Sequence, residues 1–173
     1  MARALRVSYD VMSRSNLQVI PATVEQAPIL ENLIELYAHD FSEFHPLEIG
    51  EDGRFGYRSL PLYWSEAGRH PFLLRVNEKL AGLVLVKRGE DAVWDMAEFF
   101  VMRAYRRSGI GTQAAHEVWR KFPGPWQVRV MEANVSGRRF WTEAIASFTG
   151  SIIQPVSLEH NGVSWWLFSF ESV

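Results

Sequence analysis

The chain has 173 residues, enough for one domain that buries its own core without metals or disulfides. Acidic and basic residues number 20 and 18, so the charge gives no reason to expect a nucleic acid or an anionic membrane as partner. Cysteine is absent, which excludes disulfides, zinc–cysteine sites and thiol nucleophiles. No apolar run approaches the roughly 20 residues that span a bilayer, and we expect a cytoplasmic protein.

Residues 1–16 contain three arginines but no apolar block of the kind found in signal peptides, and we expect them to form an N-terminal extension. A single domain is expected over residues 17–173, because no repeat or linker-like stretch interrupts them. Aromatic residues make up 13% of the chain, which suits a lined pocket or an apolar interface, and a homodimer is one expectation. His39 and His45 lack further ligands at metal-binding spacing, so no metal is assigned.

Apolar periodicity predicts alternating strands and helices along the chain. Thr23 and Gln26 have the spacing of a capping box, which indicates the start of the first helix. A later helix shows an apolar residue at every fourth position from Ile110 to Phe122. The expected elements are a strand at 17–20, a helix over 27–37, an irregular segment at 39–58, a helical turn at 60–66, strands at 71–76, 80–87 and 93–102, a helix at 109–122, a strand at 126–131, a helix at 136–148, and strands at 152–153 and 163–170.

The segment from Arg106 to Gly111, with the sequence RRSGIG, lies between a predicted buried strand and a predicted helix. At such a turn the first N–H groups of the helix have no intrahelical partner and point outward at the positive end of the helix dipole. Glycine lets a ligand approach the backbone closely, so the arrangement suits a pyrophosphate. A phosphate-loop ATPase is excluded because no Gly-Lys-Ser/Thr follows, and the dinucleotide fingerprint is excluded because position 106 is Arg. From these residues alone, a purely structural turn stays the alternative.

The run from Val101 to Gly111 resembles the acyl-CoA loop V-x-P-x-Y-R-x-x-G-x-G of the GNAT superfamily of N-acetyltransferases, with Arg103 in place of the usual proline. A smaller match is Asn134-Val135-Ser136 before a helix. The resemblance implies an α/β (α+β) fold with a mixed, mostly antiparallel central sheet flanked by helices, whose splayed central strands form the acyl-CoA cleft. It also implies transfer of acetyl from acetyl-CoA to a primary amine, of a small molecule or a peptide, by direct attack in a ternary complex. The alternative is a non-catalytic acyl-CoA-binding sensor or regulatory protein on the same fold.

By the same resemblance, backbone groups of the central strand hold the pantetheine arm and those of the loop hold the pyrophosphate. Arginine suits bidentate contact with phosphate, although two solvated loop arginines are the alternative for positions 106 and 107. The implied cofactor-binding residues are Phe99, Phe100, Val101, Arg106, Arg107, Ser108, Gly109, Ile110, Gly111, Thr112 and Asn134.

The run Glu98-Phe99-Phe100-Val101-Met102 is similar to the strand of spermidine/spermine N-acetyltransferases in which two adjacent acids precede Phe-Phe-Val-Met. Ala97 replaces the first acid, so Glu98 is the leading candidate for the general base. Strict strand alternation predicts that Ala97 and Glu98 face opposite sides and that Asp95 shares the face of Ala97, which makes Asp95 the second candidate. The usual tyrosine acid of the family corresponds to Trp141, whose indole only donates a hydrogen bond.

The segment between the first two helical stretches forms one wall of the acceptor site in the family. Here it carries Asp40, Phe41, Glu43 and Phe44, and acids beside aromatic rings suit a cationic amine. An ordinary acidic loop is the alternative, and the identity of the acceptor is left open.

Overall fold

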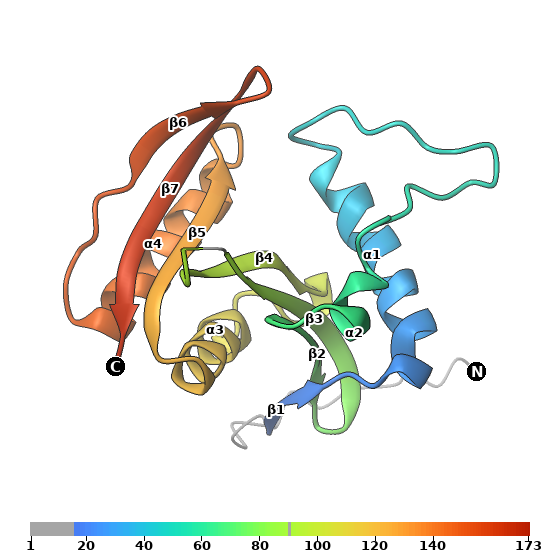
Figure 1. Ribbon diagram of the computed structural model, residues 1–173, viewed down its shortest axis with the longest axis horizontal. Coiled ribbons are helices and arrows are strands. Elements are labelled where there is room, and N and C mark those ends of the chain that lie inside the picture. Colours follow the sequence, from blue (N-terminus) through green and yellow to red (C-terminus); the bar gives the residue numbers. More distant parts are fainter. Residues whose placement is uncertain (1–15, 90) are drawn as a thin grey trace, which may run out of the picture.

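The computed structural model describes residues 16–89 and 91–173, which form one sheet with helices on both of its faces (Figure 1). The predicted extension therefore lies outside the described residues except for Asn16. In chain order the elements are β1 (Leu17–Pro21), η1 (Val24–Gln26), α1 (Ala27–Phe41), α2 (Leu62–Ser65), β2 (Arg69–Val76), β3 (Lys79–Arg88), β4 (Trp94–Val101), η2 (Arg103–Tyr105), α3 (Ile110–Lys121), β5 (Gly124–Met131), α4 (Val135–Thr149), β6 (Val156–His160) and β7 (Val163–Ser172).

The strand order across the sheet is β1-β2-β3-β4-β5-β7-β6, and each neighbouring pair is antiparallel except β4 and β5. The parallel pair is short. It joins Trp94 to Trp126 and Asp95 to Gln127, and beyond these residues the two strands diverge. The predicted mixed, mostly antiparallel sheet with splayed central strands is thus confirmed.

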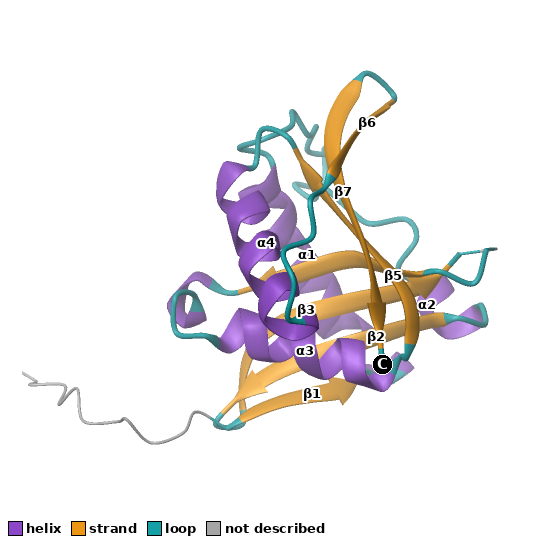
Figure 2. Ribbon diagram, turned by 90° about the vertical axis from the view of Figure 1, so that its left-hand side faces the viewer, coloured by secondary structure: helices purple, strands orange, loops and turns teal. Residues whose placement is uncertain are grey.

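Two apolar cores cover the two faces of this sheet, beneath the helices that Figures 1 and 2 show on either side of it. Helices α3 and α4 pack on one face through buried residues such as Trp119 and Ile145, and α1 and α2 cover the other through Leu30 and Tyr63. Burial of these side chains is the main stabilising contribution, as in any domain of this size. None of the helices in the described part of the chain is long and apolar enough to cross a membrane.

The predicted order of strands and helices is confirmed, with most boundaries shifted by one or two residues. The capping box is also present, because the Gln26 side chain accepts a hydrogen bond from the Thr23 N–H at 3.0 Å. It caps the short η1, and α1 follows with Pro28 in its first turn, where a proline costs no helix hydrogen bond. Helix α1 extends to Phe41, so the irregular segment covers residues 42–61 instead of starting at 39.

One predicted strand is wrong. Residues 152–153 are outside any strand, and Ile152 is 72% exposed, whereas β6 lies at Val156–His160. The cause is the turn at Asn161 and Gly162, both with positive φ, which joins β6 to β7 in a two-residue hairpin. Asn-Gly between two strands is a strong hairpin signal, and it places the partner of β7 immediately before the turn.

Candidate active site

A β-bulge in β4 determines which side chains reach the site. Leu85 and Lys87 of β3 are two residues apart and share a face, but their partners Glu98 and Asp95 on β4 are three residues apart. Ala97 is the extra residue of the bulge, and it packs against the same core as Leu85. The expectation from strict alternation that Ala97 and Glu98 face opposite sides is therefore wrong. A bulge shifts the phase of the strand and re-aims the side chains after it, as bulges near active sites commonly do.

A cavity of about 450 Å³ opens where β4 and β5 diverge, and α1, the segment 42–61, α4 and β7 also contribute to its wall. Figure 1 shows the divergence of the two strands. Glu98 lies in this wall together with Tyr37 of α1 and Tyr57 of the segment 42–61. The Tyr57 hydroxyl donates a hydrogen bond to Oε1 of Glu98 at 2.9 Å. The cavity has the size of a small-molecule site and holds a carboxyl that two phenols surround.

Burial raises the pKa of the Glu98 carboxyl above its ordinary value, because a charged group loses hydration there. Hydrogen bonding from Tyr37 and Tyr57 opposes this rise, and the nearby charges of Asp95 and Lys87 act in opposite directions. The pKa of each of the two tyrosines is raised, first by burial and then by the charge of Glu98, so both phenols stay protonated at neutral pH. A carboxyl with a raised pKa in a cavity is suited to accept a proton near neutral pH.

Asp95, the second candidate base, is in a different environment three residues earlier. It is 1% exposed and does not line the cavity. One carboxylate oxygen, Oδ2, is paired with Nη2 of Arg129 at 2.5 Å and with Nζ of Lys87 at 3.6 Å. The ion pair with Arg129 ties β4 to β5 at the last point where the two strands are paired. These contacts favour a structural role for Asp95, and of the two candidate bases Glu98 is the one that lines the cavity.

The loop before α3 has the geometry expected of an anion cradle. Gly109 precedes the helix with φ of +82°, a left-handed conformation that glycine adopts without strain. None of the backbone N–H groups of residues 107–112 donates a hydrogen bond to the described part of the chain. A Cβ atom at Gly111 would lie 3.1 Å from the ring of Phe140, so the glycine also lets α3 approach α4. The loop thus presents unpaired donors at the positive end of a helix.

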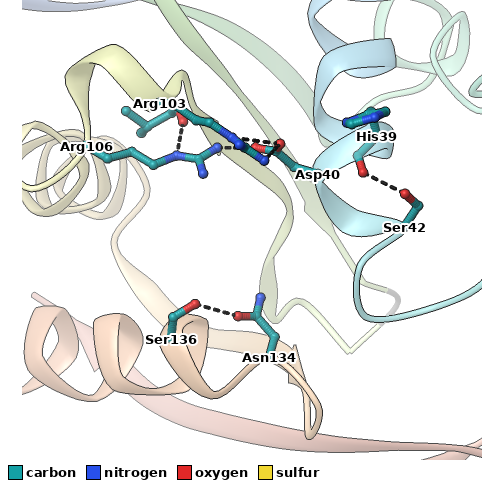
Figure 3. Close-up of polar contacts among 8 residues, drawn as sticks. His39, Asp40, Ser42, Arg103, Arg106, Asn134 and Ser136 are labelled. Atoms are coloured by element: carbon teal, nitrogen blue, oxygen red, sulfur yellow. Dashed lines mark hydrogen bonds and ion pairs between the residues drawn. The ribbon is translucent and has the colours of Figure 1, made fainter.

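Asp40 lies at the end of α1 and is paired with two arginines of the loop (Figure 3). Arg103 contacts its Oδ1 at 2.7 Å and Arg106 its Oδ2 at 2.5 Å, and Arg106 also donates to the Val101 carbonyl at 2.6 Å. Partial burial tends to raise the pKa of Asp40, but the two guanidinium groups outweigh it and hold that pKa below the ordinary value. Arg107, in contrast, is exposed and has no ion-pair partner among the described residues.

The structure separates the four residues expected to bind the acceptor. Phe41 lines the cavity, and the ring of Phe44 packs against the ring of Phe41 with centroids 6.4 Å apart. Asp40, Glu43 and Phe44 are not part of the cavity wall. Sequence reasoning missed Tyr57, Arg129 and Trp165, which do line it. Tyr57 comes from an irregular segment, where no periodicity indicates which side chains turn inward.

Asn134, expected to contact the cofactor, caps α4. Its Oδ1 accepts hydrogen bonds from the Gly137 N–H at 2.7 Å and from the Ser136 hydroxyl at 3.1 Å, the latter drawn in Figure 3. Nδ2 has no partner among the described residues, and the side chain borders the cavity. Trp141 is buried against Phe99, with ring centroids 5.0 Å apart, and also forms part of the cavity wall.

Comparison with known proteins finds this fold in the acetyltransferases of the GNAT family. A family model described as the acetyltransferase (GNAT) family matches residues 30–145. An acetyltransferase from Thermus thermophilus superposes with a TM-score of 0.64 at 16% identity, over 90% of this chain and 97% of the other. The ribosomal-protein-S18-alanine N-acetyltransferase from Escherichia coli superposes with a TM-score of 0.61 at 11% identity, over 91% of this chain and 94% of the other.

A spermidine N-acetyltransferase SpeG chimera from Vibrio cholerae and hSSAT gives a TM-score of 0.60 at 13% identity, over 91% of this chain and 96% of the other. At these identities the similarity is one of fold. A comparison with curated proteins found no significant match.

Proposed function

Because this chain belongs to the GNAT acetyltransferase family, and is therefore an acyltransferase, we propose that it transfers acetyl from acetyl-CoA to a primary amine by direct attack in a ternary complex. The observation that carries the proposal is the Glu98 carboxyl, which lies in the cavity at the divergence of β4 and β5 and accepts a hydrogen bond from Tyr57. Two proteins of the same fold are named as N-acetyltransferases of an alanine and of spermidine, which is consistent with an amine acceptor.

The groups present fit acetyl-CoA at two places. The unpaired N–H groups of residues 107–112 suit the pyrophosphate. β4 is paired with β3 as far as Val101 but with β5 only at Trp94 and Asp95, so its other edge has backbone groups available for the amide-bearing pantetheine arm. We assign the arm to Phe99, Phe100 and Val101, and the phosphates to residues 106–112 with Asn134 beside them. When bound, acetyl-CoA supplies a thioester carbonyl that an amine attacks.

Glu98 is proposed to take the proton that the amine loses. The transfer forms one N–C bond and breaks one C–S bond, whose electron pair leaves with the sulfur. The proton passes from the amine nitrogen to the Glu98 carboxylate and then to solvent, which restores the base. Tyr57 and Tyr37 hold the carboxylate in place through hydrogen bonding, and the cavity wall brings the amine close to the carbonyl.

The decisive variant is Glu98→Gln, which keeps the size of the side chain and removes the base. The maximal rate with acetyl-CoA and an amine panel, scored by CoA release and by mass of the products, should fall about 10²–10⁴-fold. Glu132→Gln, the same substitution at an exposed position, should leave the rate unchanged. If Glu98→Gln keeps the wild-type rate, Glu98 is not the base.

Tyr57→Phe tests the environment of the base through pH. The hydrogen bond from Tyr57 lowers the pKa of Glu98, so its removal should raise that pKa further. The base is active when ionised, and activity is lost as pH falls through its pKa in the folded protein. The acid limb of kcat/KM should therefore begin above the ordinary carboxyl range of about 4.3 in the wild type and move to higher pH in Tyr57→Phe. If the acid limb of kcat/KM does not move in Tyr57→Phe, Tyr57 does not influence the pKa of the catalytic base.

The non-catalytic sensor is the alternative expected from the sequence, and the same assays test it. A sensor would be stabilised against heat by acetyl-CoA, yet would release no CoA with any amine of the panel. Acetylated product from the wild type, lost in Glu98→Gln, would exclude it.

A further inference from the structure

The acceptor side of the cavity is aromatic and carries few charges. Its wall from α1, the segment 42–61 and β7 includes the five rings of Tyr37, Phe41, Phe55, Tyr57 and Trp165. The ionisable carboxylates and cations in the whole cavity wall are Glu48, Glu98 and Arg129. Such a wall favours a ligand with a bulky apolar body, because the rings provide large apolar area and little charge.

Two acids beside the cavity that would attract a polyamine are engaged by other groups, and Glu43 is exposed and outside the cavity wall. Asp40 is paired with Arg103 and Arg106. Glu35 accepts the backbone N–H groups of Phe55 and Gly56 at 2.7 and 2.9 Å, which fixes the segment 42–61 to α1. A chain of positive charges would thus meet one deep carboxyl, Glu98, and one exposed acid, Glu48, with a guanidinium nearby.

That guanidinium belongs to Arg129, which lies on β5 just past the point where β5 leaves β4. Its neighbours Val128 and Val130 belong to the core beneath α3 and α4, so Arg129 faces the side of the sheet that α1 covers, and it lines the cavity. Nη2 is held by Asp95 at 2.5 Å. Nε and Nη1 donate no hydrogen bond to any residue that the structure describes, and the side chain is 40% exposed.

An arginine anchored through one nitrogen has a fixed orientation and keeps its other donors for a ligand. The planar fork of a guanidinium matches a carboxylate, with two parallel hydrogen bonds. Asp95 is 1% exposed and cannot turn outward to follow a ligand, so the anchored arginine is preorganised at the cavity wall. Glu98 and Arg129 come from the two diverging strands and face the same cavity, one suited to an amine and the other to an anion.

We propose that the acceptor is an amino acid-like molecule, a primary amine with an aromatic or bulky apolar body and a carboxylate, and that Arg129 binds the carboxylate. The inference rests on the proposed acetyl transfer and names its substrate class. Arg129 is a specificity-determining residue in this assignment, and the five rings contact the apolar body.

The first test compares substrates on the wild-type enzyme at saturating acetyl-CoA. L-Phenylalanine, L-phenylalaninamide and phenethylamine share one body and differ in the carboxylate, and spermidine represents the polycations. Loss of a charge-assisted pair is worth roughly 10- to 100-fold, so kcat/KM for phenylalanine should exceed that for the amide and for phenethylamine by at least about tenfold. L-Tryptophan and L-leucine with their amides extend the series to other apolar bodies.

The second test changes the arginine. Because Arg129→Gln alone would leave the buried Asp95 carboxylate with only the longer contact to Lys87, the variant used is Asp95→Asn with Arg129→Gln. The ratio of kcat/KM for each acid to that for its amide should fall toward one, mainly through a higher KM for the acid. Arg139→Gln, on an exposed part of α4, is the control and should keep the wild-type ratio.

The outcomes separate this inference from the proposed function. If no amine yields acetylated product, acetyl transfer itself is wrong. If amines are acetylated but the amides, phenethylamine or spermidine match or surpass the amino acids, the carboxylate assignment is overturned and acetyl transfer stands. If the double variant keeps the wild-type ratio of kcat/KM for the acid to that for its amide, the role of Arg129 is likewise overturned.

Discussion

The N-termini of α3 and α4 border the same divergence of β4 and β5, yet only one of them is capped by a side chain. At α4 the Asn134 side chain accepts the Gly137 N–H and closes the helix end. At α3 the preceding residue is a left-handed glycine without a side-chain cap, and the N–H groups of residues 107–112 find no acceptor in the described part of the chain. Glycine in place of a capping side chain costs only about a few tenths of a kcal/mol of stability. The difference is consistent with the proposed pyrophosphate site at α3, whereas the capped end of α4 supports the fold.

The largest effect on CoA binding should come from placing a negative charge at the uncapped N-terminus of α3. Ser108→Asp puts a carboxylate beside the proposed pyrophosphate site, and one pair of like charges at about 4 Å repels by roughly 1 kcal/mol even in water. We expect CoA to bind about tenfold more weakly by calorimetry. The unfolding free energy should hold or rise slightly, because an acid at a helix N-terminus is favourable.

The control at that position is Ser108→Asn, which is isosteric with Asp and uncharged. It should bind CoA within about twofold of the wild type. Ser108 is a cleaner position than Gly111, where any side chain would also press on Phe140. Equal CoA affinity in Ser108→Asp and Ser108→Asn would mean that the pyrophosphate does not lie at α3.

The next effect concerns the capped N-terminus of α4 and should appear in the free energy of unfolding. Asn134→Ala removes the cap of α4 and should lower the unfolding free energy by about 1 kcal/mol, measured by urea denaturation. Asn134→Asp keeps an acceptor for the Gly137 N–H and should retain stability. Its lost Nδ2 donor and added charge should instead weaken CoA binding. Full stability in Asn134→Ala would remove the contrast between the two helix ends.

The smallest effect should come from the free loop arginine. Arg107→Gln removes one exposed positive charge that has no ion-pair partner in the described residues. CoA affinity should fall about threefold at low salt, and less at high salt, because exposed charges are screened over about 8 Å at physiological ionic strength. Arg120→Gln, at the other end of α3, should leave the affinity unchanged at every salt concentration.

Much of the fold could be predicted from the chain because its patterns are local. The four-residue apolar spacing of α3, the capping box at Thr23 and the strand-loop-helix order around Gly109 all follow from interactions between near neighbours in sequence. The Asn161-Gly162 turn is an equally local signal, and it places β6 directly before the turn. The apolar run that suggested a strand at 152–153 lacked a partner strand in register.

The sequence by itself thus determined the order of elements, the open loop before α3 and Glu98 as a candidate base. Only the tertiary structure decided which carboxylate meets the cavity, because the bulge at Ala97 depends on the register between β3 and β4. It also decided that Tyr57 reaches Glu98 and that Arg129 holds Asp95, contacts across 41 and 34 residues of chain. Such contacts arise from sheet order and loop packing, which no local pattern encodes.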